Sequence, residues 1–245
     1  MDTSQLESEM KFSEFYERWI RQLEGHLRLL LVAPPQHSSE AEFEPIVRKL
    51  TAHHKEYYKV KWAWAQQDAL AFFVPEWLSP LENAYLWVTG WKPSMAFRLV
   101  ESLKEARSES GASLAGLSEE QVRGIEALRL RIKAEEERVE MEMERQQVAV
   151  ADRKMVELAR LHGLARRSGD AGAAAQVDGL AEVALKGLAA GLEKVMKMAD
   201  CVRLKTMKGV LDVLTPMQCV QFLAATSMLQ IHMRKWGKIR NKSSK

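Results

Sequence analysis

The chain has 245 residues, of which 47% are hydrophobic and 28% charged, with a formal net charge of +3, which describes an ordinary globular protein with length for one large domain. The longest apolar runs, such as 29–33, are far too short to cross a bilayer, and the polar N-terminus has no signal-peptide core. Two cysteines, Cys201 and Cys219, make neither a disulfide framework nor a zinc site, and they fit an intracellular compartment.

Along the chain nearly every segment has a helical pattern. A first helix is predicted over 4–32, with Phe12, Phe15 and Trp19 on one face at spacings of three and four. That face is most simply the interior of the molecule. Tyr16 is offset from it, which favours exposure. Exposed aromatic side chains on a helix are common anchors at protein interfaces, so a contact surface formed by this cluster is the alternative.

A second helix is predicted over 39–73, and it ends before Pro75. The tryptophan-rich segment 77–94 follows and is expected to form a packed corner. Within it, Ser79, Pro80 and Glu82 have the order of an N-cap, a first helical residue and a capping-box acid. A short helix over 80–88 is therefore expected. A further helix over 93–107 and a polar loop over 108–116 complete this part of the chain.

The longest helix is predicted over 118–164. Its straight length would be about 65 to 70 Å, so it is expected either to project or to be kinked. A coiled coil with a partner is one interpretation. A bundle helix within the chain is favoured, because the apolar stripe lapses between Ile132 and Val139. The acidic run 135–137 has the pattern of a solvated face.

The segment 166–179 is rich in Gly and Ala and is predicted to be a mobile connection. Helix resumes over 177–200 and either continues or kinks through 202–214. A last helix begins at Thr215-Pro216 and is predicted to end at Gly237. The resulting expectation is an all-α, single-domain multi-helix bundle over 11–237, with one long central helix, an N-terminal tail over 1–10 and a basic tail over 238–245.

The end of the last helix is basic. A core helix with a basic end is the simplest interpretation, and contact with calmodulin, with another acidic partner or with the nuclear import machinery are the alternatives. The residues in question are Arg234, Lys235, Trp236, Lys238 and Arg240.

Catalytic patterns are not found. The sequence has no hydrolase elbow, no P-loop and no dinucleotide fingerprint, and no nucleophile accompanies a base and an orienting acid. His53 and His54 are adjacent on a helix, about 100° apart, so they cannot easily share a metal. His54 is expected to be a hydrogen-bonded core histidine. An enzyme is not expected, and no cofactor or metal is predicted.

The order of residues in the tryptophan-rich corner resembles the signature of the plant Delay of Germination domain. The same domain forms the C-terminal part of the TGA class of bZIP transcription factors. Weaker matches on both sides extend the resemblance over about residues 10–237. The signature residues are Trp77, Pro80, Glu82, Trp87, Gly90 and Pro93.

The resemblance implies seed or developmental signalling through partner proteins. In this family the stretch matching Phe15, Tyr16 and Trp19 contributes to binding type 2C protein phosphatases of abscisic-acid signalling. The founding member is associated with haem through two histidines that align with Gln230 and Arg234 here, and His232 is out of register. Stable haem binding is therefore not expected.

Three functions remain open. The first is a non-enzymatic interaction protein, in the nucleus or cytoplasm, that binds a phosphatase or transcription factors. The second is a transcription-associated factor, although the chain has no dense basic stretch before a zipper and direct sequence-specific DNA binding is not expected. The third is a sensor of haem or another apolar ligand. Self-association into a homo-oligomer is compatible with all three.

Overall fold

The computed structural model describes residues 3–32, 40–105, 114 and 116–243. All regular elements in these ranges are helical, and the one β contact is an isolated bridge between Trp87 and Gly90. The predicted all-α fold is confirmed. The elements are α1 (Thr3–Val32), α2 (Glu40–Ala65), the 3-10 turn η1 (Leu70–Phe72), α3 (Pro80–Ala84), α4 (Met95–Glu105), α5 (Glu119–Ala149), α6 (Arg153–Ser168), α7 (Ala171–Val213) and α8 (Pro216–Ser243).

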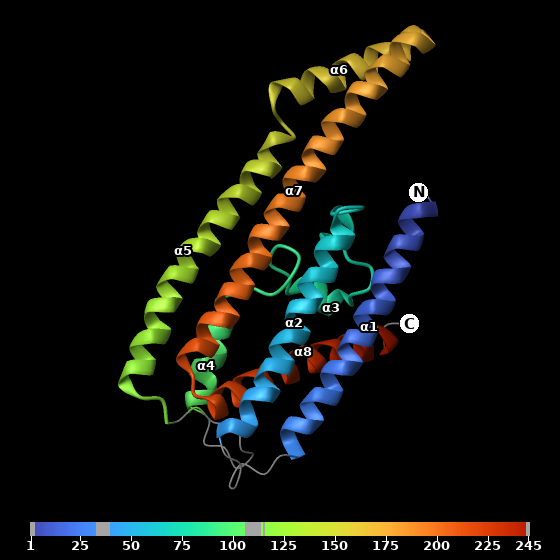
Figure 1. Ribbon diagram of the computed structural model, residues 1–245. Coiled ribbons are helices and arrows are strands. Elements are labelled where there is room, and N and C mark those ends of the chain that lie inside the picture. The colour runs from blue at the N-terminus through green and yellow to red at the C-terminus, as the bar shows by residue number, and fades with distance from the viewer. Residues whose placement is uncertain (1–2, 33–39, 106–113, 115, 244–245) are drawn as a thin grey trace.

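A packed body occupies one end of the molecule (Figure 1). Helices α1 and α2 lie side by side, and α8 crosses them while also contacting α3 and α4. The core is built from apolar side chains of α1, α2, α4 and α8, together with the inward face of α5 and the part of α7 after residue 194. Fully buried examples are Phe12, Leu23, Leu50, Val195 and Leu223. We call α1–α4, η1, α8 and residues 195–213 of α7 the body.

An antiparallel hairpin of α5 and α7 extends away from the body, and α6 folds along the far part of α7 (Figure 1). The helix predicted over 118–164 is interrupted at residues 150–152, so the expected long helix both kinks and projects. The longest helix is instead α7, with 43 residues. We call α6 and residues 171–190 of α7 the hairpin end.

The predicted connection over 166–179 is wrong in its secondary structure, because most of it is helical. Only Gly169, in a left-handed conformation with φ of 70°, and Asp170 separate α6 from α7. The Asp170 side chain accepts hydrogen bonds from the backbone N–H groups of Gly172 and Ala173 and so caps α7. The alanine-rich stretch then propagates the helix, since alanine is the best helix former.

Several helix ends also differ from the predicted ones. Helix α1 begins inside the predicted tail 1–10, and α2 ends eight residues before the predicted residue 73. Helix α8 continues past Gly237 to Ser243. Gly237 is required for packing, not for ending the helix: a Cβ there would lie 2.0 Å from the Ser79 Oγ. Residue 39, where the second helix is predicted to begin, and most of the predicted loop over 108–116 lie outside the described residues.

The lapse in the apolar stripe of α5 has a structural cause. Glu136, expected on a solvated face, is 3% exposed and accepts a hydrogen bond of 2.6 Å from the backbone N–H of Ser94, just before α4. Burial raises the pKa of this carboxyl.

None of the described helices combines the length and apolar character that a membrane span requires.

Candidate partner-binding site

The predicted aromatic cluster of α1 is mostly interior. Phe12 lies against Trp77 and Phe72, with ring centroids 4.7 and 4.8 Å apart, and Trp19 is 2% exposed. The expected exposure of Tyr16 is wrong: it is 6% exposed, and its ring lies 5.3 Å from the Arg234 guanidinium. Helix α1 is covered by both α2 and α8, so its buried arc is wider than one stripe.

Phe15 is the member of the predicted partner-binding trio that is only half-buried at the surface of the body. Its ring is tilted against that of Phe12, with centroids 5.6 Å apart, and this contact anchors it to the core. Glu14 and Arg18 are exposed beside it on α1. A partner can therefore reach Phe15 and its charged neighbours, whereas Tyr16 and Trp19 are reached only if α1 moves.

Histidines hold α1 and α2 together beneath this surface. The His53 ring stacks on Trp19 at 4.7 Å, and the Trp19 indole N–H donates to the His53 carbonyl at 3.0 Å. His54 is buried as predicted, but its Nε2 has no hydrogen-bond partner, contrary to the expected hydrogen-bonded core histidine. Burial lowers the pKa of His54 to about 4. Within the described part of the chain, no three His, Cys, Asp or Glu side chains could hold a metal ion.

The residues of the Delay of Germination signature perform structural tasks. Ser79 and Glu82 form the predicted capping box of α3, with Pro80 as its first residue. Trp77 packs in the core. Trp87 donates its indole N–H to Glu140 at 2.8 Å. Pro93 is buried ahead of α4.

A buried ion network fixes the turn that contains Gly90. Lys61 donates to Asp200 at 3.0 Å, and Arg203 donates to the same carboxyl oxygen at 2.6 Å. These three side chains are at most 1% exposed. Two cations thus share one carboxylate, and carbonyl groups of the turn accept the remaining donors. Burial, with Arg203 nearby, lowers the pKa of Lys61 to about 8 although Asp200 opposes this shift.

The same network explains Gly90 and the conformation next to it. Arg203 donates to the carbonyls of Trp87, Val88 and Trp91, and Lys61 donates to the Thr89 carbonyl at 3.1 Å. Val88 and Thr89 have φ of 39° and 62°, which costs energy for side chains of this kind. A Cβ on Gly90 would lie 2.8 Å from the Arg203 Cζ.

Sequence reasoning did not find this network. The network joins distant parts of the chain, since 139 residues separate Lys61 from its carboxylate. The sequence does contain one signal of such a network, which is a charged residue at a helix position that the 3.6-residue repeat places in the interior. The buried side chains bind one another and the carbonyl groups of the turn, so they clamp the turn to α2 and α7.

The basic end of α8 is divided between the interior and the surface. Arg234, predicted as a surface contact, is 7% exposed; it donates to Glu82 at 2.9 Å, to Glu17 and to the Trp77 carbonyl. That prediction is therefore wrong for Arg234. Lys235 pairs with Glu24 at 2.8 Å, and Lys238 with Glu17 at 2.9 Å.

The outer face of α8 carries the remaining predicted contacts. Trp236 is 50% exposed and lies 5.6 Å from the His232 ring, and Arg240 is exposed. The opposite face of α8 is buried in the core. A partner that wrapped around α8 would have to pull this helix out of the body. While α8 stays packed, a partner can contact Trp236 only by binding the outer face of the helix.

The haem positions can be compared with the structure directly. Arg234 is held by two carboxylates and cannot ligate iron, and Gln230 is half-buried. His232 Nδ1 lies 2.8 Å from the Met228 carbonyl of the preceding turn. The residues of α8 therefore do not fit a haem held by two axial ligands.

Comparison with known proteins agrees with the signature. The family model DOG1, described as seed dormancy control, matches residues 26–102. Protein DOG1-like 4 of Arabidopsis thaliana is 50% identical over 95% of this chain and 94% of its own length. Protein RESPONSE TO ABA AND SALT 1 of the same plant is 27% identical over 93% and 95%. The TGACG-sequence-specific DNA-binding protein TGA-2.1 of Nicotiana tabacum is 27% identical over 88% of this chain but 44% of its own length. The chain belongs to the DOG1-like family of seed dormancy control, and its helical domain is related to that of TGA factors.

Proposed function

We propose that this protein is a non-enzymatic regulator that acts by binding other proteins in seed-dormancy signalling, with a type 2C protein phosphatase of abscisic-acid signalling as the partner. Its family membership supports the dormancy context. The name of one relative, RESPONSE TO ABA AND SALT 1, refers to the same hormone.

The observation that carries the proposal is the contrast between a chemically closed interior and an accessible exterior. The buried charges of the body are bound to one another and to backbone carbonyls. Large apolar side chains stand exposed on the hairpin, among them Val156, Leu180 and Val183. A surface of this kind favours binding of macromolecules over bond-making chemistry.

Phe15 is the residue through which we expect the phosphatase to be contacted. It is the half-buried member of the aromatic trio, and exposed charges flank it on α1. Aromatic anchors beside charged neighbours commonly dominate the energy of protein interfaces. Loss of the ring is therefore expected to weaken binding at least tenfold.

The test is calorimetric titration of the full chain with a purified type 2C phosphatase, comparing the natural protein with Phe15→Ala. Phe73→Ala is the matched control, because Phe73 is also half-buried but lies after η1 and is not part of α1. If the natural protein does not bind at micromolar concentrations, the phosphatase is not its partner. Equal weakening by both variants would show that the effect comes from loss of stability.

A transcription-associated role is the second candidate, favoured by the similarity to TGA-2.1 across 88% of this chain. It would operate in the nucleus through other DNA-bound factors. A fluorescence anisotropy titration with a TGACG-containing duplex at near-physiological salt separates the two modes, since direct reading would give sequence-dependent binding and recruitment would give none.

We further propose that the chain does not bind haem stably, because Arg234 is committed to Glu17 and Glu82. Hemin titration monitored by the Soret band tests this. A stoichiometric band that disappears in His232→Ala would refute it and would favour the ligand-sensor function.

A further inference from the structure

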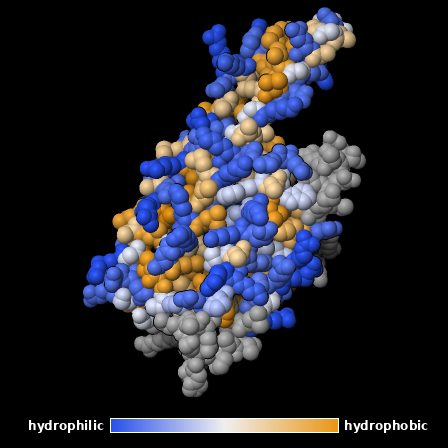
Figure 2. All heavy atoms as spheres, in the orientation of Figure 1, coloured by the Kyte–Doolittle hydropathy of each residue, from blue (hydrophilic) through white to orange (hydrophobic). Residues whose placement is uncertain are grey.

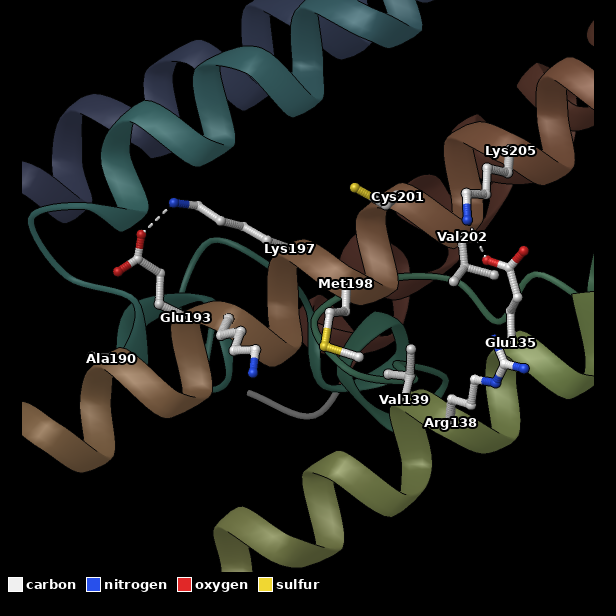
Figure 3. Close-up of a pocket in the computed structure, with 11 residues that line it drawn as sticks. Glu135, Arg138, Val139, Ala190, Glu193, Lys197, Met198, Cys201, Val202 and Lys205 are labelled. Carbon is white, nitrogen blue, oxygen red and sulfur yellow. Dashed lines mark hydrogen bonds and ion pairs between the residues drawn. The ribbon is translucent and has the colours of Figure 1, made fainter.

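A groove lies between α5 and α7, apart from the predicted partner-binding residues of α1 and α8 (Figure 3). It is an open cavity of about 540 Å³. Its floor is apolar, formed by Val139 of α5 and by Met198 and Val202 of α7. Figure 3 shows charged side chains from both helices around it. The apolar floor and charged rim have the character of a binding surface.

An exposed face of α7 leads from the groove toward the hairpin end. Residues at spacings of three and four put Leu180, Val183, Gly187 and Ala190 in line with Lys194, Lys197 and Cys201 of the groove. Leu180 is 54% exposed and Val183 is 70% exposed. A Cβ on Gly187 would meet nothing within 4 Å. Figure 2 shows apolar residues on the projecting end, flanked by hydrophilic ones.

The dimensions fit a helix. From residue 180 to residue 201 the face extends about 30 Å, the length of a helix of some 20 residues. Small residues such as Gly187 and Ala190 permit another helix to approach closely. An open groove between two antiparallel helices is completed naturally by a third helix, whose apolar side chains would pack between them.

The charges of the rim specify which helix. Glu135 is bound by Lys205 at 2.6 Å, and Glu193 by Lys197 at 2.6 Å, so both acids of the rim are neutralised. Lys194 reaches Glu142 only at 4.0 Å. Arg138 is exposed and has no ion pair within the described residues. The rim thus has two surplus cations, which select acidic groups.

We infer that the α5–α7 groove binds an amphipathic helix of a partner protein whose apolar face is flanked by Asp and Glu. The inference rests on the proposed function, since it names the surface and the chemistry of one partner contact. A second copy of the chain is a poorer occupant, because a symmetric pairing would bring the surplus cations of two rims together.

The probe is a labelled 21-residue peptide with leucines at helical spacing and glutamates beside them, titrated into the full chain by fluorescence anisotropy. A peptide with lysines in place of the glutamates tests charge, and one with a central proline tests helicity. The glutamate peptide is expected to bind at least tenfold more tightly than either. Equal binding of all three would overturn the inference.

Two double variants locate the contact. Arg138→Glu with Lys194→Glu reverses the rim and is expected to weaken the glutamate peptide at least tenfold and to favour the lysine peptide. Lys133→Glu with Lys154→Glu makes the same change in net charge at exposed positions that do not line the groove and is expected to have little effect. Equal effects of the two pairs would mean nonspecific attraction and would overturn the inference.

The remaining outcomes separate this inference from the proposed function. A dimer seen by sedimentation that Val183→Glu dissociates would identify a second copy as the occupant and refute the acidic helix. If the rim variant loses the peptide but still binds the phosphatase as the natural chain does, both proposals stand as separate contacts. If the natural chain binds the peptide but not the phosphatase, the groove stands and the named partner falls.

Discussion

The body and the hairpin end solve the problem of burying a helix in opposite ways. In the body, α7 buries even charged residues, and Asp200 and Arg203 have no exposed surface. In the hairpin end, α6 buries only Ala165, and the buried residues of α7 begin at Val195. The same helix is thus a core element at one end and a two-helix contact at the other. The body therefore supplies most of the buried contacts that stabilise the fold, whereas the hairpin end supplies exposed surface.

The largest effect is expected from breaking the ion network. Asp200→Ala leaves Lys61 and Arg203 as buried cations without a carboxylate, which should reduce the free energy of unfolding by about 3 to 5 kcal/mol. Urea denaturation measures it. Asp212→Ala removes an exposed partner of Lys208 from the same helix and should change stability by less than about 0.5 kcal/mol. Similar losses in both would show that burial does not decide the difference.

Acidification should weaken the body before the hairpin end. The unfolded chain takes up a proton on His54 near pH 6.5, whereas burial holds the pKa in the folded state at about 4. Folding therefore favours the neutral form of His54. Its contribution to the free energy of unfolding is fully present above pH 6.5 and is lost as the pH falls toward 4, by roughly 3 kcal/mol at most.

Denaturation curves from pH 7 to pH 4 measure this loss. His54→Leu should reduce the pH dependence, leaving the share of His53, whose pKa is also lowered to about 4. His162→Gln, in the hairpin end and half-exposed beside Asp178, serves as the control for loss of a histidine outside the body. An unaltered slope in His54→Leu would contradict the assignment.

Close approach at Gly90 provides a third comparison. Gly90→Ala forces the Arg203 guanidinium away from the carbonyls that it holds, and we expect a loss of about 1 to 3 kcal/mol by thermal unfolding. Substitution of Arg203 itself should cost more, since it also leaves Asp200 short of a donor. A neutral Gly90→Ala would mean that the turn relaxes without the network.

The smallest effect should come from glycines of the hairpin end. Added methyl groups at Gly163 and Gly179 meet nothing within 4 Å, so alanine should stabilise these helices by about 0.5 to 1 kcal/mol each. Hydrogen exchange should then slow about two- to fivefold in α6 and early α7, with the melting temperature of the body unchanged. A shift in global melting would show that the two parts unfold together.

Local features of this fold were predictable from sequence. The capping boxes at Ser79–Glu82 and Ser118–Gln121 and the helical class are set by neighbours within a few residues. Distant partners were not. Nothing local states that Arg234 meets Glu17, 217 residues earlier, or that Gly237 faces Ser79. The predicted exposure of Tyr16 was wrong for the same reason. The spacing of apolar residues in α1 does not indicate that two other helices cover it.

The position of α8 in the chain has a consequence for biosynthesis. This helix contacts α1, α2, α3 and α4, yet it is translated after all of them. While the ribosome is still making α5–α7, the apolar faces of α1 and α2 lack the helix that covers them. The nascent chain therefore exposes apolar surface until α8 has been synthesised, and α5–α7 can pair before the body closes.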